Sequence, residues 1–158
     1  MAMIGKSRDR EVELSEAHRH DVSVRENGNG RYGQTVTIGH HVFGADEPEA
    51  MGGQDTGPDP FELVMAGLGA CTNMTIRMYA ARKNWPLDHV GVVVRQVKVV
   101  NTEGKELRDR FTRQITLTGT LDDEQRTRLI AIADRCPVSR TLAAGAEITA
   151  VEVNRPGT

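Results

Sequence analysis

The stretch GPDPFELVMAGLGACTNMTIRMYAARKNWPL, residues 57–87, decides the fold. It opens with the residues of a helix start: Asp59 suits the N-cap, Pro60 the first helical position and Glu62 the third position of a capping box. The helix then runs for about 24 residues, at 1.5 Å per residue, and ends before Trp85. Because it is apolar on more than one side, the sequence predicts a long, buried central helix.

Two glycines interrupt this helix. Gly67 and Gly69 each cost about 1 kcal/mol relative to alanine in a helix interior. The expected compensation is the close approach of another backbone across the small residues Ala66, Gly67 and Ala70.

Upstream of the helix the pattern changes to short strands. Val22 and Val24 begin one strand, and residues 32–38 alternate at period two in a second. Asn27-Gly28-Asn29-Gly30 between them predicts a hairpin turn, because these residues tolerate positive φ. A third strand is expected at 41–43, followed by a long loop at 44–58. Its acidic residues are expected to be solvated: Asp46, Glu47, Glu49 and Asp55.

Downstream of the helix, strands and helices follow in separate runs. The pattern predicts strands at 90–100 and 111–119 with a turn at 101–104, a helix at 123–135 capped by Asp122, a short helix at 137–142 and a last strand at 147–153. This order is typical of an α+β protein. Residues 1–20 read as a polar arm, and residues 21–158 as a single domain.

Composition excludes several classes of protein. The chain has 158 residues, of which 38% are hydrophobic and 27% charged, as in globular proteins. A net charge of −2 argues against nucleic acid or anionic membrane as a partner held by bulk charge. No apolar run reaches the about 18 residues of a membrane span. Two cysteines are too few for a disulfide scaffold, so we expect a cytoplasmic protein with reduced thiols.

The two cysteines are the main candidates for chemistry. Cys71 lies in the central helix, and Cys136 lies just before Pro137, at the start of the short helix. The positive end of that helix should lower the pKa of the Cys136 thiol. A thiolate attacks peroxides, and a second thiol then resolves the sulfenic acid. The alternative is that both cysteines are buried and unreactive.

A metal site is a weaker alternative. His41 could join the cysteines as a ligand, but no ligand spacing repeats along the chain. We therefore predict neither a metal nor a cofactor.

Three motifs resemble one known family. Residues 57–87 look like the central helix of the OsmC/Ohr family (organic hydroperoxide reductases), and LDDEQRTRLIAIADRCPVSRTL, residues 121–142, resembles its second cysteine helix. GHHVFGADEP, residues 39–48, resembles one branch of OsmC-like proteins. The motifs occur in the family's order over about residues 22–153, a length typical of a single domain.

The resemblance implies an OsmC-like α+β fold, with two antiparallel sheets around long central helices in an intertwined homodimer. It also implies thiol-dependent reduction of organic hydroperoxides in the oxidative stress response. Cys71 would attack the peroxide, Cys136 would resolve the sulfenic acid as a disulfide, and a dithiol of the lipoyl type would reduce that disulfide. A non-catalytic protein that binds a small apolar ligand in the dimer cleft is the alternative.

The chain departs from the family at three positions. Phe61 stands where peroxidase members have a catalytic glutamate, and the acid here is Glu62, one residue later. Gly44 and Ser139 stand where relatives tend to carry arginine and histidine. The missing arginine could be replaced from a strand, and the candidates are Arg25, Arg31, Arg110 and Arg113. Arg31 and Glu62 therefore join the two cysteines as candidate site residues.

Overall fold

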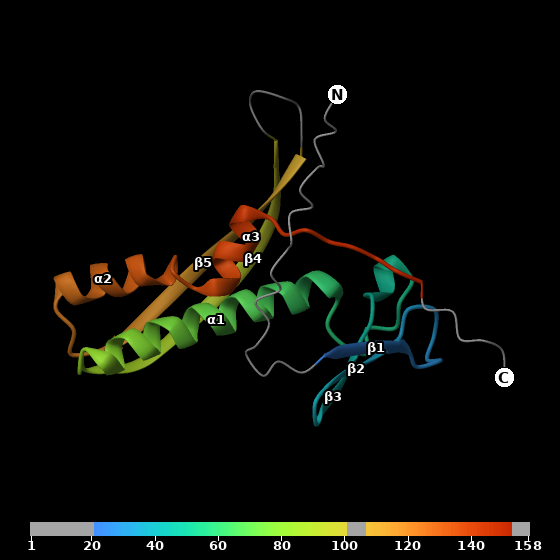
Figure 1. The fold of residues 1–158 in the computed structure, drawn as a ribbon, viewed down its shortest axis with the longest axis horizontal. Helices are drawn as coiled ribbons and strands as arrows, with labels where there is room; N and C mark the ends of the chain where they lie inside the picture. Colours follow the sequence, from blue (N-terminus) through green and yellow to red (C-terminus); the bar gives the residue numbers. More distant parts are fainter. Residues whose placement is uncertain (1–20, 101–106, 153–158) are drawn as a thin grey trace, which may run out of the picture. The chain divides into compact units, whose positions relative to one another are not determined.

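The computed structural model describes residues 21–100 and 107–152 (Figure 1). The chain folds into two compact units that divide between Pro58 and Asp59. The predicted arm at 1–20 and the predicted turn at 101–104 lie outside the described residues. That residues 21–158 form one domain stays a prediction.

The first unit contains a three-stranded antiparallel sheet in the order β1-β2-β3, drawn from blue to cyan in Figure 1. Its strands are β1 (Val22–Glu26), β2 (Gln34–Ile38) and β3 (His41–Ala45). The predicted hairpin is confirmed: Gly28 and Gly30 have φ of 77° and 67°, a region that favours glycine.

The loop after β3 is organised by Asp46. This side chain is 3% exposed, so the expectation that the loop acids are solvated is wrong for Asp46. Its carboxylate accepts hydrogen bonds from the N–H groups of Glu47, Gln54 and Thr56 and from the Thr56 hydroxyl, at 2.8, 3.1, 3.3 and 2.8 Å. Burial alone would raise the pKa of Asp46, but the Thr56 hydroxyl and the backbone donors outweigh it and lower the pKa. A short 3₁₀ helix, Glu49–Met51, lies within the span that these bonds close.

The second unit begins with α1 (Pro60–Arg82), and the predicted capping box is present. Asp59 Oδ1 accepts from the Glu62 N–H at 2.8 Å, and Glu62 Oε2 accepts from the Asp59 N–H at 2.9 Å. The helix ends at Lys83, and Asn84 follows with a φ of 53°.

The expectation that α1 is buried on more than one side is met on one face. Its buried residues are Leu68, Gly69, Thr72, Ile76 and Ala80. Met74 and Met78, on another face, are 63% and 61% exposed, because no element of the described chain covers them. At Gly67 an added Cβ would meet no atom of residues 21–100 and 107–152 within 4 Å, so this part of the chain does not supply the expected close backbone approach. At Gly69 a Cβ would meet Val94 Cγ2 at 3.3 Å, so this glycine lets α1 pack on the neighbouring strand.

That strand belongs to the second sheet, the antiparallel pair β4 (Leu87–Val100) and β5 (Leu107–Gly119). Both strands begin earlier than predicted. The reason at the start of β4 is packing: Leu87 pairs with Gly119 and is 6% exposed, so the strand continues to the point where the core ends. In Figure 1, β4 and β5 lie behind α1, which contacts β4.

Two shorter helices complete the unit: α2 (Asp123–Ala133) and α3 (Pro137–Ala144). The predicted cap at Asp122 is confirmed, and Gln125 closes a second capping box. Both helices contact α1. Ile76 of α1 and Leu129 of α2 are both fully buried and anchor the core between these helices and β4.

The predicted last strand at 147–153 is wrong over its described part. Residues 145–152 have no regular secondary structure, and Ile148 and Val151 are 91% and 86% exposed. No strand among the described residues pairs with this segment, so its backbone has no ladder partner.

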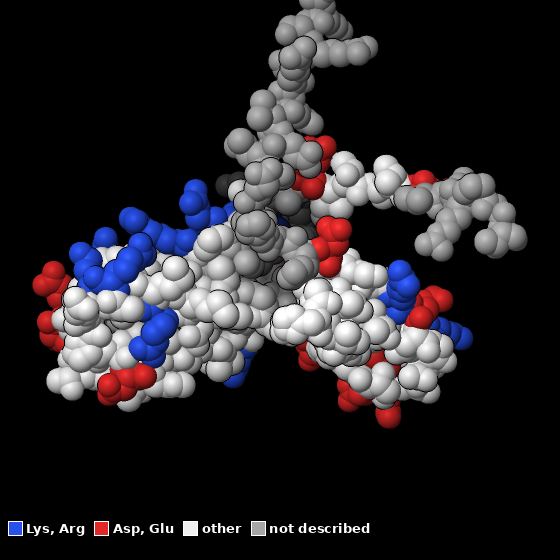
Figure 2. All heavy atoms as spheres, turned by 60° about the horizontal axis from the view of Figure 1, so that its bottom comes forward, with Lys and Arg blue, Asp and Glu red and all other residues white. Residues whose placement is uncertain are grey.

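Two surface properties follow from the sequence. None of the helices in residues 21–100 and 107–152 is long and apolar enough to cross a membrane. In Figure 2, basic and acidic side chains both occur on the visible face and neither sign covers it, in keeping with the net charge of −2.

Candidate functional site

The structure brings the two predicted cysteines together. Cys71 lies in the middle of α1 and is partly exposed, and Cys136 is the N-cap of α3 and is fully buried. Both are free thiols, and they lie close enough together that each shifts the pKa of the other. Residues from two distant segments therefore form one dithiol.

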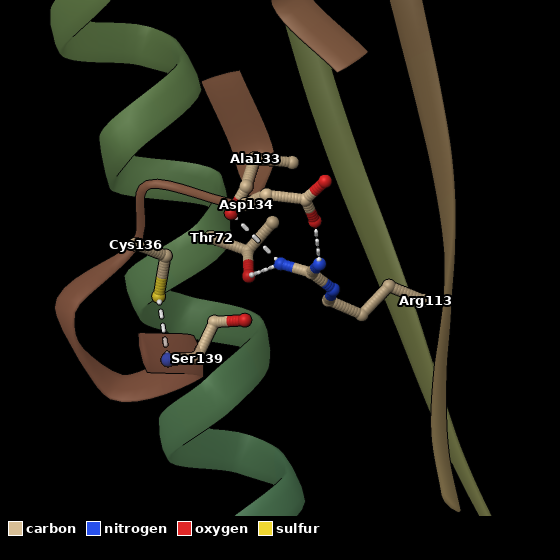
Figure 3. Close-up of polar contacts among 6 residues, drawn as sticks. All are labelled: Thr72, Arg113, Ala133, Asp134, Cys136 and Ser139. Atoms are coloured by element: carbon tan, nitrogen blue, oxygen red, sulfur yellow. Dashed lines mark hydrogen bonds and ion pairs between the residues drawn. The ribbon is translucent and has the colours of Figure 1, made fainter. Parts of the chain in front are cut away.

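Cys136 is surrounded by donors. Burial alone would raise its pKa, but the Cys71 thiol, the Ser139 N–H, the Thr72 hydroxyl and the Val138 N–H outweigh it and lower the pKa below the ordinary 9.0. The Ser139 nitrogen lies 3.5 Å from the sulfur (Figure 3). The direction predicted from the helix start is therefore confirmed.

Cys71 has the opposite shift. Burial raises its pKa, the hydrogen bond to Cys136 raises it further because Cys71 is the donor, and the Val138 N–H and the Thr75 hydroxyl only partly offset this. The first proton of the dithiol therefore leaves Cys136, and the two titrations belong to the pair.

Arg113 on β5 connects the segments that carry the two thiols (Figure 3). Its Nη1 donates to the Thr72 hydroxyl at 3.1 Å and to the Ala133 carbonyl at 2.8 Å. Its Nη2 pairs with Asp134 Oδ1 at 2.6 Å. Thr72 follows Cys71 on α1, and Ala133 and Asp134 end α2 just before Cys136. The Arg113 side chain is 15% exposed, so its contacts with Thr72 and Ala133 are largely shielded from water, whereas Asp134 is 79% exposed and the ion pair lies at the surface.

Of the other predicted residues, Glu62 belongs to the second unit, and Arg31 and His41 belong to the first. The Glu62 carboxylate is engaged in the capping box at the start of α1. Arg31 is exposed in the turn of the first unit, with its guanidinium 6.0 Å from the Tyr32 ring centre. His41, the proposed metal partner, lies in β3 of that unit. Among the described residues, no three His, Cys, Asp or Glu side chains are grouped so that they could hold a metal ion.

A cavity of about 470 Å³ lies in the second unit beside the dithiol. Leu68, Phe111 and Leu142 supply much of its apolar wall, and Arg113 and Ser139 belong to its polar wall. Ser139 also donates its N–H to Cys136, so the cavity borders the immediate surroundings of that sulfur. Its lining suits a small molecule with an apolar body.

Sequence reasoning missed Thr72 and left Arg113 as one of four arginines. A signal for Arg113 is present in the strand pattern, where it shares a face with Phe111, Ile115 and Leu117 on β5. An arginine among inward-facing apolar residues needs partners for its charge. The sequence contains no comparable sign for Thr72, whose role depends on the arginine that meets it.

The fold agrees with the comparison with known proteins. The profile of the OsmC-like protein family matches residues 53–151, well over half of the chain. The chain therefore belongs to the OsmC-like protein family. None of the curated proteins is a significant match to the sequence.

Several solved structures share the fold. An OsmC-like protein from Mycoplasma pneumoniae is 19% identical with a TM-score of 0.64, over 78% of this chain and 86% of that one. An organic hydroperoxide resistance protein OsmC from Legionella pneumophila is 21% identical with a TM-score of 0.63, over 81% and 91%. An organic hydroperoxide resistance protein from Vibrio cholerae, with captopril in one active site, is 24% identical with a TM-score of 0.58, over 84% and 90%.

Proposed function

We propose that the protein is a thiol-dependent peroxidase that reduces organic hydroperoxides through Cys71 and Cys136, in the oxidative stress response. The observation that carries the proposal is the dithiol itself, two free thiols close enough to shift each other's pKa in opposite directions. The hydroperoxide resistance named for the Legionella and Vibrio proteins supports the same substrate class.

The charge and the exposure of the two sulfurs suggest how they divide the reaction. Cys136 is the thiol that ionises first, but it is fully buried, whereas Cys71 is partly exposed. In the proposed sequence, the Cys71 proton passes along the thiol–thiol hydrogen bond to Cys136. The Cys71 thiolate is then the nucleophile that meets the peroxide.

The chemistry balances in two steps. The Cys71 thiolate attacks the outer oxygen of ROOH, the O–O bond breaks, and the alkoxide takes a proton from the solvent and leaves as ROH. The product at Cys71 is a sulfenic acid. The Cys136 sulfur then attacks the Cys71 sulfur, which forms a disulfide and releases water. A dithiol reductant, of the lipoyl type by the family resemblance, returns both thiols.

We also propose that the working form is an intertwined homodimer. The exposed apolar side chains Met74 and Met78 on α1 support a second copy as their cover, and so do Ile148 and Val151 in the C-terminal segment. A cytoplasmic location fits a site whose thiols must return to the reduced state. Arg31 and Glu62 stay candidate site residues that the variants below can test.

A peroxidase assay tests the proposal. The purified protein should consume cumene hydroperoxide when dihydrolipoamide is supplied, and Cys71→Ser should not. The cysteine-free double variant is the control for direct reaction between peroxide and dithiol. Absence of turnover in the unmodified protein, or full activity of Cys71→Ser, would contradict the proposal.

A second candidate function is the binding of a small apolar ligand without catalysis. The engagement of Glu62 in the capping box favours it, because this removes the acid nearest to the family's catalytic position. Native mass spectrometry of the purified protein would reveal a retained ligand. Rapid formation of a sulfenic acid at Cys71 with micromolar hydroperoxide would argue against this second function.

A further inference from the structure

We propose that Arg113 is a positioning residue that acts through Thr72: its guanidinium binds the hydroxyl oxygen and leaves the hydroxyl hydrogen to the Cys136 sulfur. The inference deepens the proposed function and rests on it for its catalytic meaning. The hydrogen-bond geometry itself is independent of that function.

The direction of each hydrogen bond follows from the groups involved. A guanidinium has only donors, so the Thr72 oxygen must accept from Arg113 Nη1, 3.1 Å away. A hydroxyl carries one hydrogen, which this bond does not use. The Thr72 hydroxyl is among the groups that lower the pKa of Cys136, and a sulfur anion gains stability when it accepts such a hydrogen.

Cooperativity between hydrogen bonds lets Arg113 stabilise the Cys136 thiolate without touching the sulfur. A hydroxyl that accepts a bond from a cation becomes a stronger donor, and the effect is larger in a site shielded from water. Thr72 is fully buried and the Arg113 side chain is 15% exposed. The arrangement therefore stabilises the Cys136 thiolate through one intervening hydroxyl.

The bonds of Arg113 also fix its position. The Ala133 carbonyl and the Asp134 carboxylate, both close before Cys136 in the chain, hold the guanidinium in place. Arg113 on β5 and Asp134 after α2 are therefore the charged members of this network, and Cys71 on α1 is the titratable neighbour of Cys136. Arg108, Asp109 and Arg110 of β5 line the cavity that Ser139 also borders. Arg135 and Arg140, on either side of Cys136 in the chain, are exposed.

The test reads the protonation of each thiol directly. Protein labelled with ¹³C at cysteine Cβ gives two signals, which Cys71→Ser assigns, and their shifts are followed against pH. Thr72→Val, which keeps the shape and removes the hydroxyl, should move the Cys136 titration to higher pH. Its thiolate fraction at neutral pH should fall by roughly tenfold, the effect of losing one hydrogen bond to a charged group. Thr72→Ser, which keeps the hydroxyl, should titrate close to the unmodified protein.

Arginine variants distinguish an effect of Arg113 that passes through Thr72 from a direct effect of its positive charge on the sulfur. Arg113→Met should shift the Cys136 titration in the same direction as Thr72→Val. The double variant should shift it no further than Thr72→Val alone, because the arginine acts through the threonine. Arg126→Met is the matched control: Arg126 donates to the Leu117 and Gly119 carbonyls and should leave both thiol titrations unchanged.

Two results would overturn the inference. One is a Cys136 titration that Thr72→Val leaves in place in folded protein. The other is additive shifts in the double variant, which would mean that Arg113 acts on the sulfur by itself. Neither result depends on turnover. An inactive protein with the expected shifts would therefore refute the proposed function, and the role of Arg113 through Thr72 would still hold.

Discussion

Asp46 in the first unit and Cys136 in the second are two buried groups that use the same physical device. Asp46 is 3% exposed and Cys136 is fully buried, and each gathers backbone N–H donors and a threonine hydroxyl. In both cases burial opposes the charge and the donors outweigh burial, so that the pKa falls. The two sites therefore pose the same electrostatic problem.

The two sites differ in whether the buried group has a reactive neighbour. The Asp46 carboxylate closes a loop, and its hydrogen-bond partners among the described residues are backbone N–H groups and one threonine hydroxyl. Cys136 meets a second thiol, Cys71, whose pKa moves the other way. The comparison teaches that donors around a buried anion make a structural anchor, and that a reactive partner is what turns such an anchor into a candidate redox site.

The largest expected effect is a difference in peroxide turnover between variants of Cys136 and variants of Asp46. Cys136→Ser should reduce dithiol-dependent peroxide turnover by at least about a hundredfold, because no intramolecular disulfide can form. Asp46→Asn, assayed beside it, should keep turnover within about twofold of the unmodified protein, because Asp46 takes no part in the redox steps. Equal loss in both variants would break the comparison.

A smaller effect separates them by stability. Asp46→Asn replaces one carboxylate oxygen by an NH₂ group, which would face the N–H and hydroxyl donors that now bind the carboxylate. The thermal unfolding midpoint of this variant at neutral pH should therefore fall by several degrees. Asp55→Asn, an exposed acid of the same loop, is the control and should change little. An unchanged midpoint in Asp46→Asn would show that the carboxylate does not hold the loop.

The pH dependence of unfolding sharpens the same point. The folded pKa of Asp46 lies below its ordinary 3.8, so its stabilisation is present above about pH 4 and is lost as the pH falls through the folded pKa. The difference between unmodified protein and Asp46→Asn should therefore shrink on acidification. Cys136 also has a lowered pKa, but the stability that it contributes changes with pH only as the pH approaches 9.0. The raised pKa of Cys71 opposes that contribution in the same pH range. A difference that stays constant from pH 7 to about pH 2 would contradict this assignment to Asp46.

The smallest expected effect concerns a third carboxylate, Glu62. If it serves only as a cap, Glu62→Ala should cost about 1 kcal/mol of stability and leave turnover within twofold. Gln125→Ala in the second capping box is the matched control, because it removes the same kind of bond at the start of α2. A large loss of turnover in Glu62→Ala alone would instead support the predicted catalytic role.

Local chemistry made much of this fold predictable. Asp59 and Glu62 specified the start of α1, and the Asn27–Gly30 turn specified the first hairpin, because these signals act within a few residues. The last strand was predicted from alternation alone, and it has no partner among the described residues. Alternation reports which faces differ in polarity, and it does not report whether a partner is present.

The site was predictable in part for the same reason. The two cysteines stood out by residue type and by the family motifs, and the helix start before Pro137 indicated the lower pKa of Cys136. The contact between Arg113 and Thr72 joins segments far apart in the chain, and the burial of Asp46 depends on how its own loop folds over the carboxylate. Such contacts are set by packing, which no local pattern records.

The most direct test of the account is the product of one equivalent of hydroperoxide. Reduced protein treated with cumene hydroperoxide should yield one equivalent of alcohol and lose both free thiols, and peptide mapping should find a single Cys71–Cys136 disulfide. Cys136→Ser should instead stop at a sulfenic acid on Cys71. Survival of both thiols, or a disulfide that forms only between chains, would contradict the claim that these two residues are one redox pair.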